Sequence, residues 1–552
     1  MDYSSLVEVY EKLQATPKKL EKADIVASLL RSINDDEELR IVLALLQGKI
    51  YHESEELQTG IANQIVIGAL VKLGFSKKEV LLIFKETGDL GLTAEKLAKK
   101  KRQMSLIDKT LEVEKVYDSM RELATLSGKS SQSKKQNILL ELLNFSGPGE
   151  AKYIIRTVLE ELRLGIAEGI IRDAIAKAYG ISPEVIENAY NLKTDFGEVA
   201  FIAKEKGVEG LVDIKIELGM PIKVMLAEKA ESLEQALFDA ENPAIEVKYD
   251  GLRTLIEKKG DKIWIFTRRL ENVTKQFPDL VKLCRENIME DTAIVEGETI
   301  ALKNGLPAPF QELSKRIHRK YDIKGTSDDI PIQVNLFDCL LSSGEQVLDR
   351  PFSERRAILE KNIRVVEGKF QLAQQIRTKE IGAAEEFYKM ALKNGQEGVM
   401  VKNLNKPYQA GKRVGNMYKV KPEKETFDVV ITGAQWGEGK RANWLSSFIL
   451  SIRDGETGEL LEIGKMGTGL TDDQFKEATE ILKPLIEFEK DNTVALKPKV
   501  VIEVGYQEIQ SSPTYKSGFA LRFPKLIRFR DDKSVDDVDT LERIERLFRI
   551  GS

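Results

Sequence analysis

The spacing of apolar residues in the first part of the chain predicts helices. Between residues 151 and 164 apolar side chains recur at the interval of one helix face, at Ile155, Val158, Leu159 and Leu162. Helix-breaking residues at 147–149 and a glycine at 165 bound this run, so we expect a helix over 151–164. A second helix is expected from about Glu168 to Gly180. Segments with helical spacing of apolar residues, separated by short breaks, continue to about residue 212 and predict an all-α region.

A strand pattern begins near residue 244, where apolar and polar side chains alternate. Residues 245–249 would place Glu246 and Lys248 on one face of a strand and three apolar side chains on the other. Residues 252–256 and 263–267 flank Lys259-Gly260-Asp261, which predicts a hairpin. Strands and helices then mix as far as Pro422, as is typical of an α+β domain.

The last part of the chain is β-rich. Short apolar runs at 429–431, 447–452 and 500–504 are separated by glycines, which indicates a small barrel. At 552 residues the chain is too long for a single core, since a domain averages about 150 residues. We therefore predict a multidomain protein with an all-α domain at 1–212, an α+β domain at 213–424 and a β-barrel at 425–552.

Composition narrows the chemistry. Hydrophobic residues make up 42% and charged residues 31%, which describes a folded chain rather than a disordered one. Two cysteines cannot make a four-thiolate zinc site, and with only two histidines a mechanism that needs a histidine base, a triad or a multi-histidine metal site is disfavoured. Cys284 and Cys339 need no role beyond that of small buried apolar side chains. The net charge of −5 does not exclude nucleic acid, because cations can still gather along one groove.

Lys248 is the first candidate for covalent chemistry. It ends the predicted strand and is followed by Tyr249-Asp250-Gly251-Leu252-Arg253. A protonated lysine is a poor nucleophile, and neighbouring cations or a metal favour loss of its proton. Taken alone, the short pattern is more typical of a surface strand whose lysine is solvated, because four-letter patterns recur by accident.

Further motifs follow Lys248 in a fixed order. They are Thr267-Arg268-Arg269, Glu296-Gly297-Glu298, Phe337-Asp338, Glu397-Gly398-Val399-Met400-Val401-Lys402 and Lys419-Val420-Lys421-Pro422. Each has a simpler interpretation by itself: Phe337 could be a core strand residue, and the lysines a solvated strand face. The ordered set, however, resembles the covalent nucleotidyltransferase superfamily, which comprises DNA ligases, RNA ligases and RNA-capping enzymes.

The resemblance implies a role for each motif residue. Lys248 would form a lysyl-AMP phosphoramide, Glu246 would contact the adenine and Phe337 would stack on it. Arg253 and Arg268 would hold ribose and phosphate, and Glu298 would bind ribose or a metal. Glu397 would help to hold Mg²⁺ or another divalent cation, with Lys402 in the same pocket. The α-phosphate contacts would come from Lys419 and Lys421, with Arg413 as a further nucleotide contact. ATP is the implied cofactor, and fixed cations suit the charge that develops on an attacked phosphate.

Both ends of the chain also resemble DNA ligases. Glu150–Arg156, leading to Leu162-Arg163-Leu164-Gly165, is similar to the DNA-binding domain of the larger ATP-dependent enzymes. Arg163 and the backbone near Gly165 would contact the DNA phosphates. Leu521–Lys533 resembles the final motif of these ligases, which an OB-fold carries and which would orient the pyrophosphate of ATP.

The resemblance therefore implies an archaeal- or eukaryotic-type ATP-dependent DNA ligase. It would seal 5′-phosphate/3′-hydroxyl nicks in duplex DNA during replication, repair and recombination, and we expect a monomer. A capping guanylyltransferase or RNA ligase is the alternative enzyme class, and a degenerate ligase acting as a DNA scaffold is the non-enzymatic one. The acidic N-terminus and the absence of a run of about 20 apolar residues predict no membrane partner and an intracellular location, cytoplasmic if the source is archaeal.

A short segment between two helical regions suggests a protein partner. Gln103-Met104-Ser105-Leu106 follows the basic run Lys99–Arg102 and aligns with the place where archaeal-type ligases carry a sliding-clamp peptide. Such peptides insert a glutamine and a few apolar or aromatic anchors into pockets. Leu106 and Ile107 stand where aromatic anchors are common, so we expect a weak contact. A solvated linker is the alternative.

Overall fold

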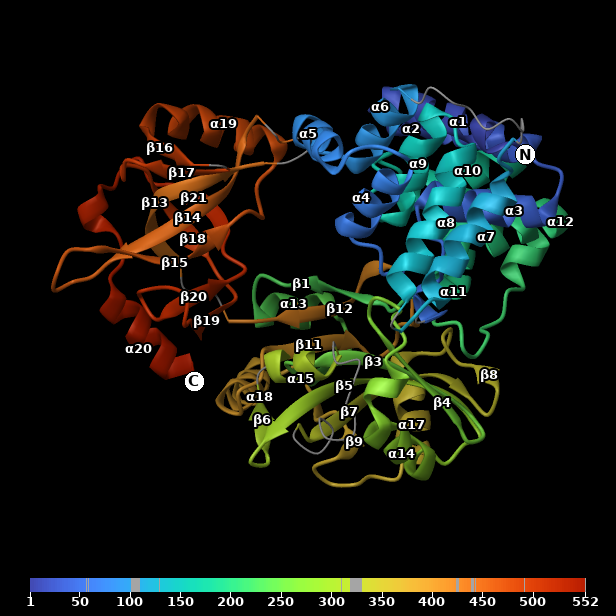
Figure 1. Ribbon diagram of the computed structural model, residues 1–552. Helices are drawn as coiled ribbons and strands as arrows, with labels where there is room; N and C mark the ends of the chain where they lie inside the picture. Colours follow the sequence, from blue (N-terminus) through green and yellow to red (C-terminus); the bar gives the residue numbers. More distant parts are fainter. Residues whose placement is uncertain are drawn as a thin grey trace. The chain divides into compact units, whose positions relative to one another are not determined.

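The computed structural model describes residues 1–55, 57, 59–100, 110–128, 130–308, 310–317, 330–422, 426–437, 441, 443–490 and 492–551. The chain divides into two compact units, Met1–Lys421 and Pro422–Ser552 (Figure 1). The first unit contains a helical region followed by a region of mixed strands and helices.

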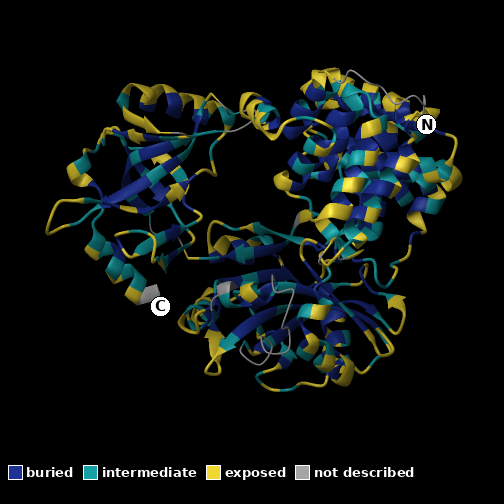
Figure 2. Ribbon diagram, in the orientation of Figure 1, coloured by how far each residue is buried: buried dark blue, intermediate teal, exposed yellow. Residues whose placement is uncertain are grey.

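Residues 1–212 are helical, as predicted. The helices are α1 (Tyr3–Ala15), α2 (Lys19–Ser32), α3 (Asp36–Gln47), α4 (Asn63–Lys72), α5 (Lys77–Thr87), α6 (Leu90–Lys100), α7 (Val113–Thr125), α8 (Ser131–Phe145), α9 (Pro148–Val158), α10 (Glu168–Tyr179), α11 (Pro183–Lys193) and α12 (Phe196–Val212). They share one continuous apolar core, and the buried faces of the helices in Figure 2 lie toward it.

The prediction of a helix over 151–164 is wrong at its C-terminal end. Helix α9 begins at Pro148, where Pro and the acidic Glu150 suit a helix start, and it ends at Val158. Glu160 then adopts a φ of 58° and Arg163 a φ of 57°, which a right-handed helix does not allow. Leu162 is nevertheless buried, because the irregular turn folds back onto the core, so its apolar spacing imitated a longer helix.

The region after residue 212 is the predicted α/β mixture. Its strands are β1 (Leu226–Lys229), β2 (Pro243–Lys248), β3 (Leu252–Lys259), β4 (Lys262–Thr267), β5 (Thr292–Lys303), β6 (Leu306–Ala308), β7 (Ile332–Ser342), β8 (Glu345–Gln346), β9 (Phe370–Leu372), β10 (Gln375–Arg377), β11 (Gly398–Asn403) and β12 (Arg413–Val420). The helices are α13 (Leu233–Asp239), α14 (Pro278–Asn287), α15 (Phe310–Ile317), α17 (Phe352–Asn362) and α18 (Ile381–Lys393).

These strands form two sheets. One has the order β1-β12-β11-β2-β10, and the other is built on β4-β3-β5-β7-β8 with β6 and β9 attached. Helices α13 and α18 pack on the first sheet, and α14, α15 and α17 on the second (Figure 1). Leu255, Phe266 and Leu340 of the second sheet share a buried cluster with Met417 of β12, so the two sheets face each other across an apolar layer.

The hairpin expected around Gly260 is present. Strands β3 and β4 pair antiparallel with Lys259 opposite Lys262, and Gly260 adopts a φ of 58° in the turn. The two cysteines are free and buried in one apolar cluster, which confirms their assignment to the core.

The second unit is β-rich, as predicted. Its elements are β13 (Thr426–Trp436), β14 (Leu445–Arg453), β15 (Leu460–Met466), α19 (Asp472–Leu482), β16 (Ile486–Lys490), β17 (Thr493–Leu496), β18 (Val501–Gly505), β19 (Glu508–Ser511), β20 (Phe519–Arg522), β21 (Lys525–Phe529) and α20 (Leu541–Gly551). The long strand β13 pairs with β14, β17 and β18, which bends the sheet around one apolar core.

Candidate active site

Lys248 lies where the chain crosses from one sheet to the other. It is the last residue of β2, opposite Gly398 of β11, and the next strand, β3, belongs to the second sheet. The crossing is tight: at Gly251 a Cβ would lie 2.4 Å from the carbonyl oxygen of Thr299, so only glycine fits there. This turn places the side chain of Lys248 at the junction between the two sheets.

Glu397 joins two of the candidate lysines. Its backbone N–H donates to the carbonyl oxygen of Lys248 at 3.0 Å, and its Oε2 is ion-paired with both Lys248 Nζ and Lys421 Nζ. Burial acts to raise the pKa of Glu397, but the charges of Lys248 and Lys421 prevail and lower that pKa to about 2. Glu397 is therefore ionised at neutral pH and orients both ammonium groups.

A second carboxylate, Glu298, lies near the same lysine. It stands on β5 directly opposite Arg253 of β3. Loss of hydration raises the pKa of Glu298 to about 7, although the charges of Lys248 and Arg253 act in the opposite direction. The negative charge of Glu397 adds to this increase, because it disfavours a second negative charge on Glu298.

Cations from three segments gather on this junction. We call Arg268, Arg413, Lys419 and Lys421, together with Lys248, the cation cluster. Burial and the charges of Lys421 and Arg413 lower the pKa of Lys419. Loss of hydration and the charges of Arg253 and Arg413 lower the pKa of Arg268. Like charges this close are costly unless an anion lies between them, so the arrangement suits a polyphosphate.

Arg253 is the most constrained of the candidate cations. Its Nη1 donates to the Met225 carbonyl at 2.7 Å, and its Nη2 to Glu296 Oε2 at 2.7 Å. Burial acts to lower the pKa of Arg253, but the charge of Glu296 prevails and raises that pKa above its usual range. Among the described residues, Arg253 Nε and Glu296 Oε1 have no hydrogen-bond partner, so a ligand could satisfy either group.

Glu246 and Phe337 form a second part of the site. Glu246 is 2% exposed, and its Oε2 accepts from Lys402 Nζ at 2.6 Å. Phe337 is only half-buried, although its four neighbours on β7 are all buried: Val334, Asn335, Leu336 and Asp338. The Arg253 guanidinium and the Lys402 ammonium lie 5.5 Å and 4.4 Å from its ring centre. An aromatic face beside a fixed charge pair can receive a flat polar ring.

The interpretation of the candidate lysines as a solvated strand face does not describe this structure. Lys402 is 5% exposed and pairs with Glu246, so it is not a solvated side chain. Lys421 pairs with Glu397 and so is more than a solvated strand residue.

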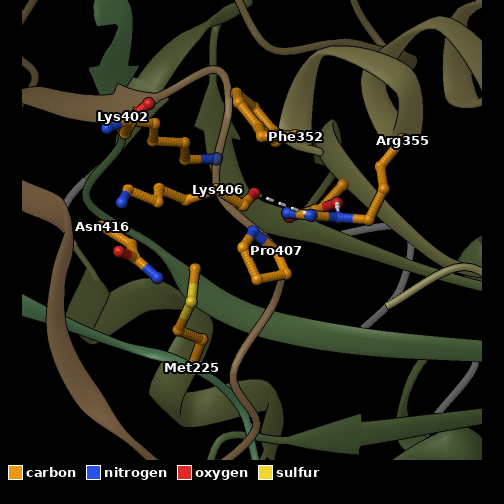
Figure 3. A pocket seen from close by; sticks show the side chains of 9 residues that line it. Met225, Phe352, Arg355, Lys402, Lys406, Pro407 and Asn416 are labelled. Carbon is orange, nitrogen blue, oxygen red and sulfur yellow. Dashed lines mark hydrogen bonds and ion pairs between the residues drawn. The ribbon is translucent and has the colours of Figure 1, made fainter. Parts of the chain in front are cut away.

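Lys402 also lines a small pocket (Figure 3). Its lining residues are Met225, Asp338, Phe352, Arg355, Lys402, Asn403, Lys406, Pro407 and Asn416. Arg355, at 1% exposure, makes two hydrogen bonds to Asp338, of 2.8 and 2.9 Å, and so anchors the residue that follows Phe337. Arg355 and its neighbour Arg356 could not be found from the sequence, because two consecutive arginines on a helix give no sign that both are buried.

The DNA-contact candidates lie on the turn between α9 and α10. Arg163 Nη1 is 3.2 Å from Asp89 Oδ2, and its Nη2 is also ion-paired with Glu161. Gly165 adopts a φ of 63°, and the buried Lys22 Nζ binds the carbonyl oxygens of Leu164 and Gly165. The buried ammonium of Lys22 thus holds the turn in place, while the side chain of Arg163 remains 38% exposed.

Several cations of Leu521–Lys533 are paired within their own unit. Arg528 Nε donates to Glu503 Oε2 at 2.7 Å, and Arg530 and Lys533 both bind Asp428. The predicted clamp segment, Gln103–Leu106, lies outside the described residues.

Three family models match the chain in order. They are "DNA ligase N terminus" over residues 2–176, "ATP dependent DNA ligase domain" over 224–421 and "ATP dependent DNA ligase C terminal region" over 441–533. Together they cover most of the chain, and the second contains every residue of the junction described above. The chain belongs to the ATP-dependent DNA ligases.

Full-length relatives agree with this assignment. The ligase is 44% identical to the DNA ligase of Nanoarchaeum equitans, over 100% of this chain and 99% of the relative. It is 42% identical to the DNA ligase of Archaeoglobus fulgidus, again over 100% and 99% of the two chains. The solved structure named Pmar-Lig_PreS3 is 17% identical and superposes with a TM-score of 0.57 over 95% of this chain and 99% of that one, which supports the fold.

The predicted family, fold class and enzyme activity are thus confirmed: the protein is an archaeal-type ATP-dependent DNA ligase, and DNA is its substrate. Within the described part of the chain, no helix has the length and apolar character needed to cross a bilayer.

Proposed function

We propose that Lys248 is the nucleophile of this ligase and that the enzyme seals 5′-phosphate/3′-hydroxyl nicks through a lysyl-AMP intermediate. The observation that supports this is the ion pair of Lys248 with Glu397, at the centre of the cation cluster. Because its pKa is lowered to about 2, the Glu397 carboxylate is too weak a base to take the proton of Lys248, and it orients the lysine instead. The cation cluster supplies the fixed charges that an attacked α-phosphate requires.

The proposed reaction proceeds in three balanced steps. Lys248 Nζ loses a proton to solvent and attacks the α-phosphorus of ATP, forming an N–P bond as the bond to pyrophosphate breaks and a second proton passes from the nitrogen to solvent. The 5′-phosphate oxygen of the nick then attacks the same phosphorus, and the N–P bond breaks as the nitrogen of Lys248 is protonated again. Finally the 3′-hydroxyl oxygen attacks the 5′-phosphorus, its proton passes to solvent, and the bond from that phosphorus to AMP breaks.

For nucleotide binding we propose the roles implied by the resemblance. Phe337 stacks on the adenine, Glu246 contacts its edge, and Arg253 and Arg268 hold ribose and phosphate. Lys419, Lys421 and Arg413 bind the phosphates. The partial exposure of Phe337 and the unsatisfied Arg253 Nε both support a ligand at this place.

The carboxylates also fit a magnesium ion, which we propose as the metal cofactor. Mg²⁺ binds through one or two carboxylates and keeps several waters, so Glu298 and Glu397 suffice as donors. No cluster of three or more His, Cys, Asp or Glu suited to a metal occurs in the described ranges, which is consistent with so sparse a site. When bound, the metal would neutralise phosphate charge.

We further propose that residues 1–212 bind duplex DNA through Arg163 and the backbone at Gly165, that 213–424 carry adenylation, and that 425–552 form an OB-fold. A monomeric enzyme that acts in replication, repair and recombination, with a weak sliding-clamp contact at Gln103–Leu106, completes the proposal.

Adduct formation tests the central claim. The enzyme is incubated with α-labelled ATP, GTP or NAD and then analysed by denaturing electrophoresis. We expect ATP to label the wild type, and Lys248→Ala and Lys248→Arg to abolish both label and nick sealing, because arginine does not easily lose its proton. Lys259→Ala, on the exposed end of β3, is the matched control and should label normally. An adduct of normal yield in either Lys248 variant would place the nucleophile elsewhere.

A further inference from the structure

The carboxylate of Glu246 is held by more than one cation. Besides Lys402 on Oε2, its Oε1 accepts from Gln375 Nε2 at 2.9 Å and from Arg356 Nη1 at 3.4 Å. Gln375 stands directly opposite Glu246 on β10, and Arg356 comes from α17. Three segments far apart in the sequence thus meet on one buried carboxylate.

Arg356 is itself fixed at three points. Its side chain is 4% exposed, its Nη2 donates to the carbonyl oxygen of Ala373 at 3.0 Å, and its Nε donates to Glu360 Oε1 at 2.8 Å. Gln375 is also oriented, because its Oε1 accepts from Arg377 Nε at 3.2 Å, which leaves its Nε2 facing Glu246. Neither donor can rotate away from the carboxylate without losing another hydrogen bond.

The distribution of these donors leaves one acceptor position open. Each carboxylate oxygen has two lone pairs, so Oε1 is saturated by Arg356 and Gln375, whereas among the residues that the structure describes Oε2 accepts only from Lys402. The ammonium of Lys402 has further N–H groups. Glu246 Oε2 and Lys402 Nζ therefore present one acceptor and one donor side by side, next to the half-buried ring of Phe337.

Such a pair matches the edge of adenine, which offers an amino donor at N6 and an acceptor at N1. Guanine carries the opposite order, an acceptor at O6 and a donor at N1. A carboxylate and an ammonium that could exchange places would accept either base. Discrimination therefore requires that the order of acceptor and donor be fixed.

We propose that Arg356 and Gln375 are positioning residues for base selection, which hold Glu246 so that the nucleotide pocket accepts adenine and rejects guanine. This inference rests on the proposed contact between Glu246 and the adenine. Arg356 and Gln375 touch no substrate atom, and they act only through the carboxylate.

The test compares the formation of labelled enzyme adduct from ATP and from GTP over a range of nucleotide concentrations. We expect Arg356→Met and Gln375→Met each to lower the ATP-to-GTP preference about tenfold, since a hydrogen bond to a charged group contributes about that factor. The loss should appear as a raised apparent KM for ATP with a smaller change in the maximal rate. Arg356→Lys keeps the charge and should restore part of the preference.

Glu360→Gln is the matched control, because it removes one charge on the exposed side of α17, whereas its amide oxygen still accepts from Arg356 Nε and so keeps Arg356 in place. Its preference should equal that of the wild type. Should Arg356→Met fail to fold, Gln375→Met decides alone, since Gln375 is only half-buried.

Glu246→Gln separates this inference from the proposed function. If that variant loses the preference for ATP while Arg356→Met and Gln375→Met keep it, the carboxylate selects the base without help and the inference is overturned. If Glu246→Gln also keeps the preference, Glu246 does not recognise the base, and the inference falls together with that part of the proposed function.

Discussion

Glu257 should make the adenylation region less stable as the pH rises. It lies on β3 with 0% exposure, opposite Trp264, and no ion pair to it occurs in the described part of the chain. Its Oε2 accepts from the Gly219 N–H at 2.6 Å, but its Oε1 has no partner there. A buried carboxyl group with a single hydrogen bond favours its neutral form.

The size of the effect follows from the pKa. Burial raises the pKa of Glu257 from 4.5 to about 7, although the hydrogen bond from Gly219 acts in the opposite direction. The folded state then binds the proton more tightly than the unfolded state, so the free energy of unfolding falls as the pH rises between these values. At about 1.4 kcal/mol per pKa unit, the loss amounts to about 3 kcal/mol at pH 8. Below pH 4.5 the stability is fully present, and above about pH 7 the loss is complete.

Glu257→Gln should remove this dependence, because the amide is neutral and still accepts the Gly219 hydrogen bond. The difference in unfolding free energy between the variant and the wild type should be small at pH 5 and about 3 kcal/mol in favour of the variant at pH 8. Urea titrations followed by tryptophan fluorescence measure it. Trp436→Phe with Trp444→Phe leaves Trp264, the neighbour of Glu257, as the reporter.

Glu231→Gln, on the exposed surface, is the control and should change the stability equally little at both pH values. A difference between Glu257→Gln and the wild type that stays constant from pH 5 to pH 8 would refute the reasoning. It would mean that the carboxyl group is hydrated or paired in solution.

Three further predictions concern the nucleotide, the DNA and the clamp. Phe337→Ala should raise the apparent KM for ATP in adduct formation by about tenfold or more, since stacking on an aromatic ring contributes about 1–3 kcal/mol. Phe337→Tyr keeps the ring and should show little change; equal KM values for all three enzymes would contradict stacking. Arg163→Ala should lower the slope of log binding constant against log salt for nicked duplex by about one and leave adduct formation unchanged. Arg172→Ala, on the adjacent helix, is its control, and identical salt slopes for both variants and the wild type would argue against a phosphate contact. Gln103→Ala with Leu106→Ala should reduce stimulation of ligation by the cognate sliding clamp, and undiminished stimulation would eliminate that segment as the contact.

Much of the local structure could be predicted from the sequence. The hairpin around Gly260 follows from a turn glycine between two β-rich runs, and the helix ending at Tyr179 follows from the glycine after it. These features depend on neighbours within a few residues, and turn chemistry and periodicity encode them directly. The order of the motifs from Lys248 to Lys421 could likewise be seen in the sequence, because each motif is a short continuous segment.

The end of α9 shows where local pattern fails. The apolar spacing from Ile155 to Leu162 is that of a helix, yet the backbone leaves the helix after Val158. Leu162 is buried because the turn folds onto the core, where the hidden ammonium of Lys22 binds the carbonyls at 164 and 165. Periodicity reports which side chains are buried and says nothing of the backbone conformation that buries them.

The partners within the site were decided by the tertiary structure alone. Lys248, Glu397 and Lys421 were each named from their motifs, but only the pairing of β2 with β11 brings Glu397 beside Lys248. Arg356 and Gln375 carried no sequence signal, because their meeting with Glu246 depends on strand register and on how α17 packs. A side chain's charge is a property of the sequence. Its burial, its partners and its pKa depend on residues a hundred positions away, which only folding brings into contact.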